Sequence, residues 1–595
     1  MNYTDEQQKI FETIDKKKHK NVLINSVAGS GKTTAMVGLV EHILMKHPNA
    51  RILYLVFNKS MQQEAERKFS KMMNNVTVKT AHSFAYQIWA RVHGGFEASN
   101  KFRMDILSNN LYKNYKLPAN IRYTKHCYMD ALHNDCTLQW SKLEVFCNNL
   151  ATAIDQNSRE ITYDLPNGKK RTTYGYEYKK GIILQPKHVD VFKKIYEDHE
   201  KSSIFTHNMY LKEVASLNNL PHLNYNYLIF DEAQDANMFM LKIVINLPVE
   251  QRWFVGDSKQ AIYQFMKCVN AFEEVDGPVY ELTKSFRFGQ EIADIQDVVN
   301  NICITGTEQK PKTVDNKKKT VLFRTNSGML DYAIKLVKEH EDGAIKLKYV
   351  NSSFDTIEEC GLKDSQRNAL FFFYKSLKDD GQYEKAEWLD DTFKINYYKD
   401  NYGCMKRSNN DVVPECFKDV LAFQSECAKE GDEFTFREII QMIRVEDADV
   451  LKLAKMYDEY QEDICPIMAK LIQAENGETG DRTEYFLCTA HKSKGLEWDD
   501  VEIAGDFTLT ESSETDTGTL KRTKNFNDEM NLIYVAMTRG RYRLNATALG
   551  PELRNAGIDV DDSQLLIDVS ENPLDRELIL SRPLVSEREP VKALV

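Results

Sequence analysis

Two short stretches of the sequence carry residues that are suited to phosphate chemistry. The first, SVAGSGKTT, follows the apolar run NVLINS, so a strand leads into a glycine-rich turn and then into Lys-Thr-Thr. A turn of this kind at a helix start presents backbone N–H groups to a phosphate, with Lys32 placed for the β- and γ-phosphates and Thr33 for Mg²⁺. The residues expected to hold the nucleotide here are Ser26, Ala28, Gly29, Ser30, Gly31, Lys32, Thr33 and Thr34.

The second stretch, LIFDEAQD at residues 228–235, ends an apolar strand with two acids. The carboxyl ends of parallel strands meet at one sheet edge, so Asp231 is expected to reach the Mg²⁺ shell and Glu232 to polarise the attacking water. Asp235 fits a simple helix cap equally well. Binding alone does not need the second acid, so the two stretches together predict hydrolysis of a nucleoside triphosphate.

Three further stretches offer polar groups for the γ-phosphate. FVGDSKQAIYQF supplies Gln260 as a phosphate sensor, LTKSFRFGQEI supplies Arg287, and LIYVAMTRGR supplies Arg539. Positive charge that stabilises the transferring phosphoryl group is a general requirement of such reactions. Surface arginines are usually solvated, so these assignments need support from elsewhere in the chain.

The length and composition indicate the number of domains and the cellular compartment in which this chemistry would occur. The chain has 595 residues, a formal net charge of −11 and eleven cysteines without a C-x-x-C pair. It contains no apolar run of transmembrane length and no signal-peptide core at its start. We expect several domains, no membrane and a reducing compartment: bacterial or viral-host cytoplasm, or the nucleus in a eukaryote. The acidic balance disfavours non-specific nucleic-acid binding by the whole surface but permits a local basic groove.

The pattern of apolar residues predicts an α/β fold with parallel sheets. Helical patterns cover much of 84–155 and 340–475, and the last residues mix acids with prolines. Residues 161–178 predict a hairpin around Asn167-Gly168. Strands are expected at 21–26, 51–57, 227–231, 252–256, 320–324 and 485–489, and helices at 32–46 and 531–541.

Ten stretches, in order, resemble the superfamily 1A helicases of the UvrD/Rep/PcrA type. TAHKSKGLEW and YVAMTRG are the most specific of them, and FNKS and THNMYLK are closest to the F-box DNA helicase branch. The sequence begins at the first motif, so we expect no F-box and no role in ubiquitin ligation. The stretches are YTDEQQKI, SVAGSGKTT, VFNKSMQQEAERKF, KTAHSFAY, FDEAQDAN, VGDSKQAIYQF, LTKSFRF, LFRTN, TAHKSKGLEWDDV and EMNLIYVAMTRGR.

The resemblance implies a role for each matching residue. Gln7 would read adenine, Phe286 would stack on it, and Glu497 would contact the ribose. Arg287 and Arg539 become arginine fingers from the two sides of the cleft, with ATP and Mg²⁺ as the ligands. The residues implied to line single-stranded DNA are Asn58, Lys59, His82, Phe265, His491 and Lys494. Phe265 and His82 also fit as core residues.

The implied architecture has two RecA-like P-loop NTPase lobes with mainly helical insertions. Lobe 1A is expected at 1–85 and 205–278, insertion 1B at 86–204, lobe 2A at 279–340 and 475–550, insertion 2B at 341–474, and an acidic, partly flexible tail at 551–595.

The implied activity is ATP-driven 3′→5′ movement on single-stranded DNA by a monomer, with duplex unwinding or protein displacement. Its partners would be single strands, junctions between single- and double-stranded DNA, and proteins of replication or recombination. Another interpretation is a nucleotide-switch or scaffolding ATPase that recruits partners without separating strands. The 161–178 hairpin, with Lys169, Lys170 and Arg171 near three tyrosines, fits an arm that grips DNA or, equally, a solvated tip.

Overall fold

The computed structural model of the chain describes residues 3–14, 19–92, 154–164, 170–179, 182–184, 207–217, 219–221, 223–263, 268–340, 343–350, 397–399, 405–407, 482–513 and 516–580, with a few single residues at 467–474. The chain divides into two compact units. The first unit consists of Met1–Ala85, Asn218–Gly361 and Gln473–Val595. The second unit consists of Tyr86–Leu217 and Leu362–Ile472. Both sheets that position the candidate site belong to the first unit.

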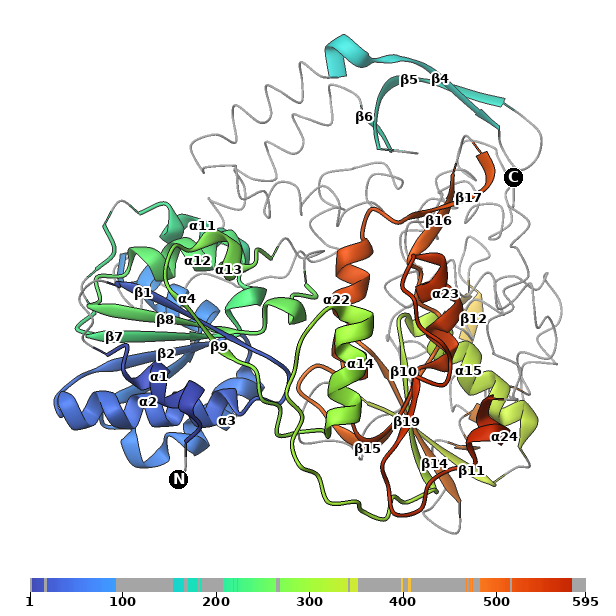
Figure 1. Ribbon diagram of the computed structural model, residues 1–595. Coiled ribbons are helices and arrows are strands. Elements are labelled where there is room, and N and C mark those ends of the chain that lie inside the picture. The colour runs from blue at the N-terminus through green and yellow to red at the C-terminus, as the bar shows by residue number, and fades with distance from the viewer. Residues whose placement is uncertain are drawn as a thin grey trace. The chain divides into compact units, whose positions relative to one another are not determined.

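Six parallel strands form the first sheet, in the order β3-β2-β7-β8-β1-β9 (Figure 1). Every residue of β2, β7 and β8 is buried, as expected for central strands that are covered on both faces. The strands are β1 (Asn21–Ser26), β2 (Ile52–Val56), β3 (Val76–Thr80), β7 (Tyr227–Asp231), β8 (Gln251–Gly256) and β9 (Val279–Leu282).

Helices pack on this first sheet through apolar side chains at helical spacing. Leu39 and Ile43 of the second helix join Ile24 and Tyr54 of the strands in one buried core. The helices are α1 (Asp5–Phe11), α2 (Lys32–Lys46), α3 (Lys59–Lys68), α4 (Ala81–Val92), α12 (Met238–Asn246) and α13 (Ala271–Glu274). We call the first sheet with its helices the first lobe.

The second sheet has the strand order β11-β14-β10-β15-β18-β19 and is parallel except for its last pair. Its strands are β10 (Lys318–Phe323), β11 (Ile345–Tyr349), β14 (Thr483–Thr489), β15 (Trp498–Ile503), β18 (Gly540–Asn545) and β19 (Leu566–Asp568). Its helices are α14 (Gln290–Asn300), α15 (Asn326–Glu339), α22 (Phe526–Met537), α23 (Gly550–Asn555) and α24 (Arg576–Leu580). We call this sheet with its helices the second lobe.

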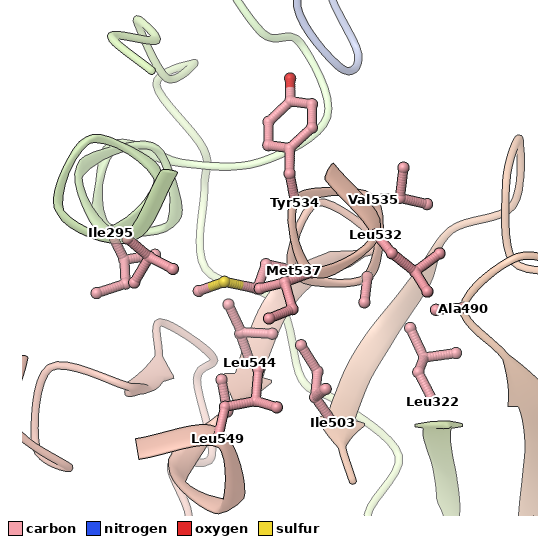
Figure 2. Close-up of a cluster of buried hydrophobic side chains, with 14 of the residues drawn as sticks. Ile295, Leu322, Ala490, Ile503, Leu532, Tyr534, Val535, Met537, Leu544 and Leu549 are labelled. Atoms are coloured by element: carbon pink, nitrogen blue, oxygen red, sulfur yellow. The ribbon is translucent and has the colours of Figure 1, made fainter. Parts of the chain in front are cut away.

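Helix α22 is central to the core of the second lobe. Figure 2 shows Met537 of α22 beside Leu544 and Ile503 of the strands, in a cluster where all three are fully buried. In the same view the phenol of Tyr534 points away from these side chains. One helix therefore anchors the second lobe and also directs a polar group out of its core.

Three smaller sheets complete the described structure. The strand pairing of the predicted hairpin is confirmed, because β4 (Arg159–Asp164) pairs antiparallel with β5 (Lys170–Lys179), which continues to β6 (Ile182–Leu184). The turn predicted at Asn167-Gly168, and Lys169 beside it, lie outside the described residues. The other two are the antiparallel pairs β12 (Tyr397–Lys399) with β13 (Met405–Arg407) and β16 (Thr510–Ser513) with β17 (Asp516–Arg522).

The predicted α/β class with parallel sheets is confirmed, and several element boundaries differ from the expectation. The helix expected over 531–541 is α22, which ends at Met537 because Gly540 already enters β18. Strand β9 lies in the first sheet and β11 in the second, beyond the boundaries expected at 278 and 340.

Much of the expected flexible tail instead carries regular structure. Residues 551–580 contribute to α23, β19 and α24. The reason is a buried Arg543 in β18, which forms an ion pair with Asp568 at 3.1 Å and donates to Ser570 Oγ at 3.0 Å. These contacts fix the segment that follows β19 against the second sheet.

Candidate functional site

The phosphate loop joins β1 to α2 through two glycines in the left-handed region. Gly29 has φ +74° and Gly31 has φ +72°. A Cβ at Gly29 would lie 2.6 Å from Arg287 Cβ, so no side chain fits there. Gly31 is the N-cap of α2 and offers no side-chain acceptor. The first N–H groups of α2 therefore have no side-chain cap, which is the arrangement that binds a phosphate.

The other loop residues have distinct surroundings. Ser26 is buried, and its hydroxyl donates to the carbonyl oxygen of Gly256 at 2.8 Å, which links the ends of β1 and β8. The N–H of Ala28 donates to Tyr534 Oη at 3.0 Å. Within the described residues, the buried Ser30 Oγ has no hydrogen-bond partner. Thr33 and Thr34 lie in the first turn of α2, next to Lys32.

Lys32 bridges the two acids at the end of β7. Its ammonium forms an ion pair with Glu232 and lies 3.2 Å from Asp231 Oδ1. Burial by itself would lower the pKa of Lys32, but the two carboxylates raise it above the usual range. The predicted meeting of the two motifs is therefore observed as direct contact between them.

The two acids are held in different ways. Asp231 accepts a hydrogen bond from the buried Tyr54 hydroxyl at 2.7 Å. Glu232 has a left-handed backbone (φ 55°, ψ 42°), a conformation that costs a non-glycine residue about 1 kcal/mol or more. Burial would raise the pKa of Glu232, but Lys32 and Lys494, with a hydrogen bond from Gln234, lower it to about 2.

A buried hydrogen-bonded group follows β8. Gln260 donates from Nε2 to Asp257 Oδ2 at 2.8 Å, and the Tyr534 hydroxyl of the second lobe donates to the same oxygen at 3.0 Å. Burial raises the pKa of Asp257 to about 6, although hydrogen bonds from Lys259 N–H, Tyr534 and Gln260 oppose the shift. Through Tyr534 the second lobe thus touches both the phosphate loop and the Gln260 segment.

Both predicted arginines lie close to these groups. Arg539, which follows α22, is fully buried and donates to the carbonyl oxygens of Val535 (2.8 Å) and Leu496 (3.1 Å) and to Gln260 Oε1 (3.4 Å). Burial, and then the nearby Arg287, lower the pKa of Arg539 to about 9, so it stays protonated at neutral pH.

Arg287 lies on the connection between β9 and α14. Its Nε donates to Glu497 Oε2 at 2.8 Å and its Nη1 donates to the Thr538 carbonyl oxygen at 3.1 Å. Glu497 also accepts from Arg541 at 3.3 Å. The guanidinium groups of Arg287 and Arg541 are therefore held by acceptors of the second lobe.

The residues expected to read the base lie against Gly31. Gln7 is buried, and its Oε1 accepts from the Thr4 N–H at 3.1 Å, which orients the amide. A Cβ at Gly31 would meet Gln7 Nε2 and the Phe286 ring, each at 3.5 Å. Phe286 is 48% exposed, and the Lys284 ammonium lies over its ring at 5.7 Å from the centroid.

A single cavity of about 840 Å³ collects these groups. All of the predicted catalytic and nucleotide-binding residues except Gln7 line it, from both lobes. The donor set fits a nucleoside triphosphate with Mg²⁺: backbone N–H groups and Lys32 suit phosphates, and the oxygen donors of Thr33 and Asp231 suit a hard divalent cation. The unpaired Ser30 hydroxyl adds one more polar group at the loop.

Three of the residues that were expected on DNA line the nucleotide cavity, namely Asn58, His491 and Lys494. Asn58 caps α3 by accepting from the Met61 N–H at 2.9 Å, and Lys59 donates to Gln62 Oε1 at 3.1 Å. His82 lies in α4, and Phe265 lies outside the described residues. No single surface of these residues is therefore defined by the described part of the chain.

The two predicted DNA residues of the second lobe, His491 and Lys494, have partly buried side chains at this cavity. Burial, and then the charge of Arg324, lower the pKa of His491 to about 4, so this ring is neutral near pH 7. The ammonium of Lys494 forms an ion pair with Asp235, close to Glu232. Asp235 does not cap the next helix, because the N-cap of α12 is Asn237. Burial raises the pKa of Asp235 to about 6, with Lys494 opposing the shift.

Sequence reasoning missed Tyr54, Asp257 and Tyr534 as parts of the site. Asp257 and Tyr534 lie inside stretches that carried the motifs, VGDSKQ and LIYVAMTRG, but their mutual contact joins residues 277 positions apart. No local pattern signals such a pair. A tyrosine within the apolar strand ILYLV was a weak signal that one strand residue has a polar partner.

The parallel sheets, the phosphate loop and the paired acids define a P-loop NTPase with two RecA-like lobes. Residues 3–272 match the family model of the UvrD/REP helicase N-terminal domain, and residues 435–549 match that of the UvrD-like helicase C-terminal domain. Together the two matches cover more than half of the chain. The chain therefore belongs to the UvrD-like helicases of superfamily 1, and the resemblance expected from the motifs is confirmed.

Two relatives show how far this similarity extends. The chain is 24% identical over 555 residues to F-box DNA helicase 1 of Gallus gallus, covering 90% of this chain and 48% of that protein. It is 23% identical over 561 residues to F-box DNA helicase protein 1 of Schizosaccharomyces pombe, covering 88% of this chain and 55% of that protein. The chain thus spans about half the length of these curated relatives. Among the residues that the structure describes, every helix falls short of the length and apolarity needed for a membrane span.

Proposed function

We propose that this chain is an ATP-driven motor that moves 3′→5′ along single-stranded DNA. One observation carries the proposal: the phosphate loop, both acids of β7, Gln260 and two arginines line one cavity that both lobes build. A simple nucleotide-binding protein does not need a base, a sensor and two arginines around one phosphate. Such a set serves hydrolysis that depends on how the lobes contact each other.

The chemistry assigned to each group follows from its position. ATP would place its phosphates on the loop, where the ammonium of Lys32 would exchange its carboxylate partners for phosphate oxygens. Glu232 would then orient and deprotonate the attacking water. Thr33 and Asp231 would hold Mg²⁺, which would neutralise charge on the phosphate oxygens when bound.

The remaining groups would sense the γ-phosphate and couple it to movement. Gln260 is hydrogen-bonded to Asp257 of the first lobe and to Arg539 of the second, so a shift of Gln260 on loss of the γ-phosphate would alter contacts in both lobes. Arg287 and Arg539 would stabilise the developing charge and would be withdrawn when the lobes separate. Repeated closing and opening would then give directional steps along a strand.

The DNA substrate is proposed from the family and from the names of the two relatives, both DNA helicases. Single strands and junctions of single- and double-stranded DNA would be the substrates, and a monomer would suffice. Asn58, Lys59, His82, Phe265 and His491 would contact the strand. The β4–β5 hairpin would add basic and aromatic contacts, and replacing Lys169, Lys170 and Arg171 by alanine should then weaken DNA binding at low salt.

Strand displacement on tailed duplexes tests the proposed activity. The protein should release a labelled strand from a duplex with a 3′ single-stranded tail and not from its 5′-tailed counterpart. Glu232→Gln should still bind ATP but lose about 100-fold or more in turnover, the usual range for removal of a general base. Unwinding from the 5′ tail alone would contradict the polarity, and full turnover by Glu232→Gln would contradict the role of Glu232.

Two further measurements separate the related activities. Release of streptavidin from a 5′-biotinylated single strand reports 3′→5′ movement even where duplex unwinding is absent. ATP hydrolysis with and without oligo(dT), and with oligo(U) for comparison, tests whether the polymer stimulates turnover. Equal rates under all three conditions would point to a nucleotide switch and would refute the motor.

A further inference from the structure

Lys494 lies in the turn that follows β14 of the second lobe, and within the described part of the chain its ammonium contacts polar groups of the first lobe. It forms an ion pair with Asp235, donates to the Gln260 carbonyl oxygen at 2.9 Å and lies 3.8 Å from Glu232 Oε2. Its side chain is 13% exposed, and its ammonium lies over the Tyr263 ring, 5.3 Å from the ring centroid. This position differs from that of a lysine which follows a DNA backbone across a solvated groove.

Asp235 depends on this contact. It is 1% exposed, and within the described residues its Oδ1 has no hydrogen-bond partner, while its Oδ2 meets the Lys494 ammonium. A buried carboxylate without a cation is strongly unfavourable, so breaking the ion pair between Lys494 and Asp235 would destabilise the protein. The pair joins the second lobe to the short helix that follows Glu232.

Glu232 has a separate ammonium near each oxygen. Lys32 contacts Oε1 and comes from the first lobe, whereas Lys494 faces Oε2 and comes from the second. If Lys32 moves to the phosphates of ATP, Lys494 is the cation that stays beside the carboxylate. The Lys494 ammonium donates to Asp235 and to the Gln260 carbonyl oxygen, and Glu232 Oε2 lies 3.8 Å away, so contact with a DNA phosphate would compete with these acceptors in a largely buried place.

We propose that Lys494 is a positioning residue for ATP hydrolysis, which holds the Glu232–Asp235 segment from the second lobe, and that it does not contact the DNA strand. This inference rests on the proposed function, since it assumes that Glu232 is the base. The contact links the base to the approach of the two lobes, because separating them would remove Lys494 from Glu232 and Asp235.

Three variants at this contact separate the two roles. Lys494→Met keeps an unbranched side chain and removes the charge, and Lys494→Arg keeps the charge. Asp235→Asn removes the partner carboxylate. Lys492→Met, two residues earlier and outside the cavity lining, controls for charge loss in the same turn. Each variant is measured for kcat and KM with saturating oligo(dT), for binding of a fluorescent ADP analogue, and for nucleotide-free binding of labelled oligo(dT) at several salt concentrations.

The proposal predicts a defined pattern. Lys494→Met should lower kcat about 30-fold, which corresponds to ~2 kcal/mol, with little change in the affinity for the ADP analogue. Its oligo(dT) affinity and salt slope should match those of the wild type. Lys494→Arg should recover about a tenth or more of the wild-type kcat, because the charge is kept although the geometry differs.

A double variant excludes a purely structural role. Lys494→Met with Asp235→Asn removes the unpaired buried carboxylate, so the protein should fold even where Lys494→Met alone does not. If Lys494 acts on Glu232, the double variant keeps the low kcat, and Asp235→Asn alone retains more activity than Lys494→Met. Recovery of wild-type kcat in the double variant would overturn the proposal.

A contact with DNA would give a different result. Loss of one phosphate contact on a single strand should lower the salt slope by about 0.7 and weaken oligo(dT) binding, with kcat preserved at saturating DNA. That result would also overturn the inference. If the wild type itself shows no DNA-stimulated hydrolysis, the proposed function fails; if the wild type is active and Lys494→Met equals it, only this inference fails.

Discussion

Replacing Tyr534 by phenylalanine should destabilise the nucleotide-free protein and weaken ATP binding. The ring would stay in the second-lobe core, so no cavity forms and the change is confined to the hydroxyl. That hydroxyl accepts from the Ala28 N–H at 3.0 Å and donates to Asp257 Oδ2 at 3.0 Å. The substitution therefore removes two contacts of the second lobe with the first and leaves everything else in place.

The magnitude follows from what each partner retains. The Ala28 N–H would be left without its acceptor in a buried place, which costs about 1–3 kcal/mol. Asp257 would lose one donor but keep Gln260 at 2.8 Å and the Lys259 N–H at 3.1 Å, so its share is about 1 kcal/mol. The free energy of unfolding should fall by about 2–4 kcal/mol. Because Ala28 belongs to the phosphate loop, the KM for ATP should rise about tenfold.

Urea unfolding followed by tryptophan fluorescence measures the first effect, and the midpoint shift multiplied by the m-value gives the free-energy change. Steady-state hydrolysis with saturating oligo(dT) measures the second. Tyr280→Phe is the matched control, because it removes a phenol oxygen at the edge of the first-lobe core and should change stability by no more than about 0.5 kcal/mol. If Tyr534→Phe unfolds like the wild type and has the same KM, the hydroxyl does not join the lobes and the reasoning is refuted.

Three other substitutions follow from the same geometry. Tyr54→Phe removes the 2.7 Å hydrogen bond to Asp231, so the Mg²⁺ concentration for half-maximal hydrolysis should rise roughly tenfold, and an unchanged Mg²⁺ titration would contradict this. Gly29→Ala adds a Cβ 2.6 Å from Arg287 Cβ at φ +74° and should abolish binding of a fluorescent ADP analogue; Gly343→Ala has a similar φ of +86° with its nearest atom at 3.7 Å, so it should bind normally. Burial and Arg324 lower the pKa of His491 to about 4, below about 6.5 in the unfolded chain, so its contribution to stability is present above pH 6.5 and is lost as pH falls towards 4. Between pH 7 and pH 5 this loss is about 2 kcal/mol, and His491→Asn should flatten the pH dependence of the unfolding midpoint by that amount.

The sequence was most informative where function is concentrated in short segments. The phosphate loop, the acids after β7 and the strands 21–26 and 227–231 could be predicted because glycines, acids and apolar runs are adjacent in the chain. The Tyr534–Asp257 bond and the Tyr54–Asp231 bond could not, because each joins segments that only tertiary packing brings together. Lys494 shows the same limit: its motif predicted a function but not which side of the second lobe its ammonium would face.

Boundaries were less predictable than elements for a related reason. Composition suggested a flexible tail after 550, yet one buried arginine, Arg543, recruits Asp568 and Ser570 and adds an antiparallel strand to the second sheet. A single residue in β18 thus contacts the segment on both sides of the end of β19. The composition of the tail did not indicate that Asp568 and Ser570 have a partner in β18.

The close approach of Gly29 to Arg287 constrains how this enzyme can be recombined with its relatives. The Gly29 carbonyl oxygen accepts from the Phe286 N–H at 2.8 Å, and the space above Gly29 is filled by Arg287 and Ser285. Residues 285–287 therefore pack closely against the phosphate loop, although they lead into α14, the first helix of the second lobe. In a chimera that exchanges second lobes between two such enzymes, the crossover belongs after Phe288, so that loop and arginine are inherited from one parent. A crossover at the end of β9 would pair each loop with a foreign arginine segment and should yield folded lobes with poor hydrolysis.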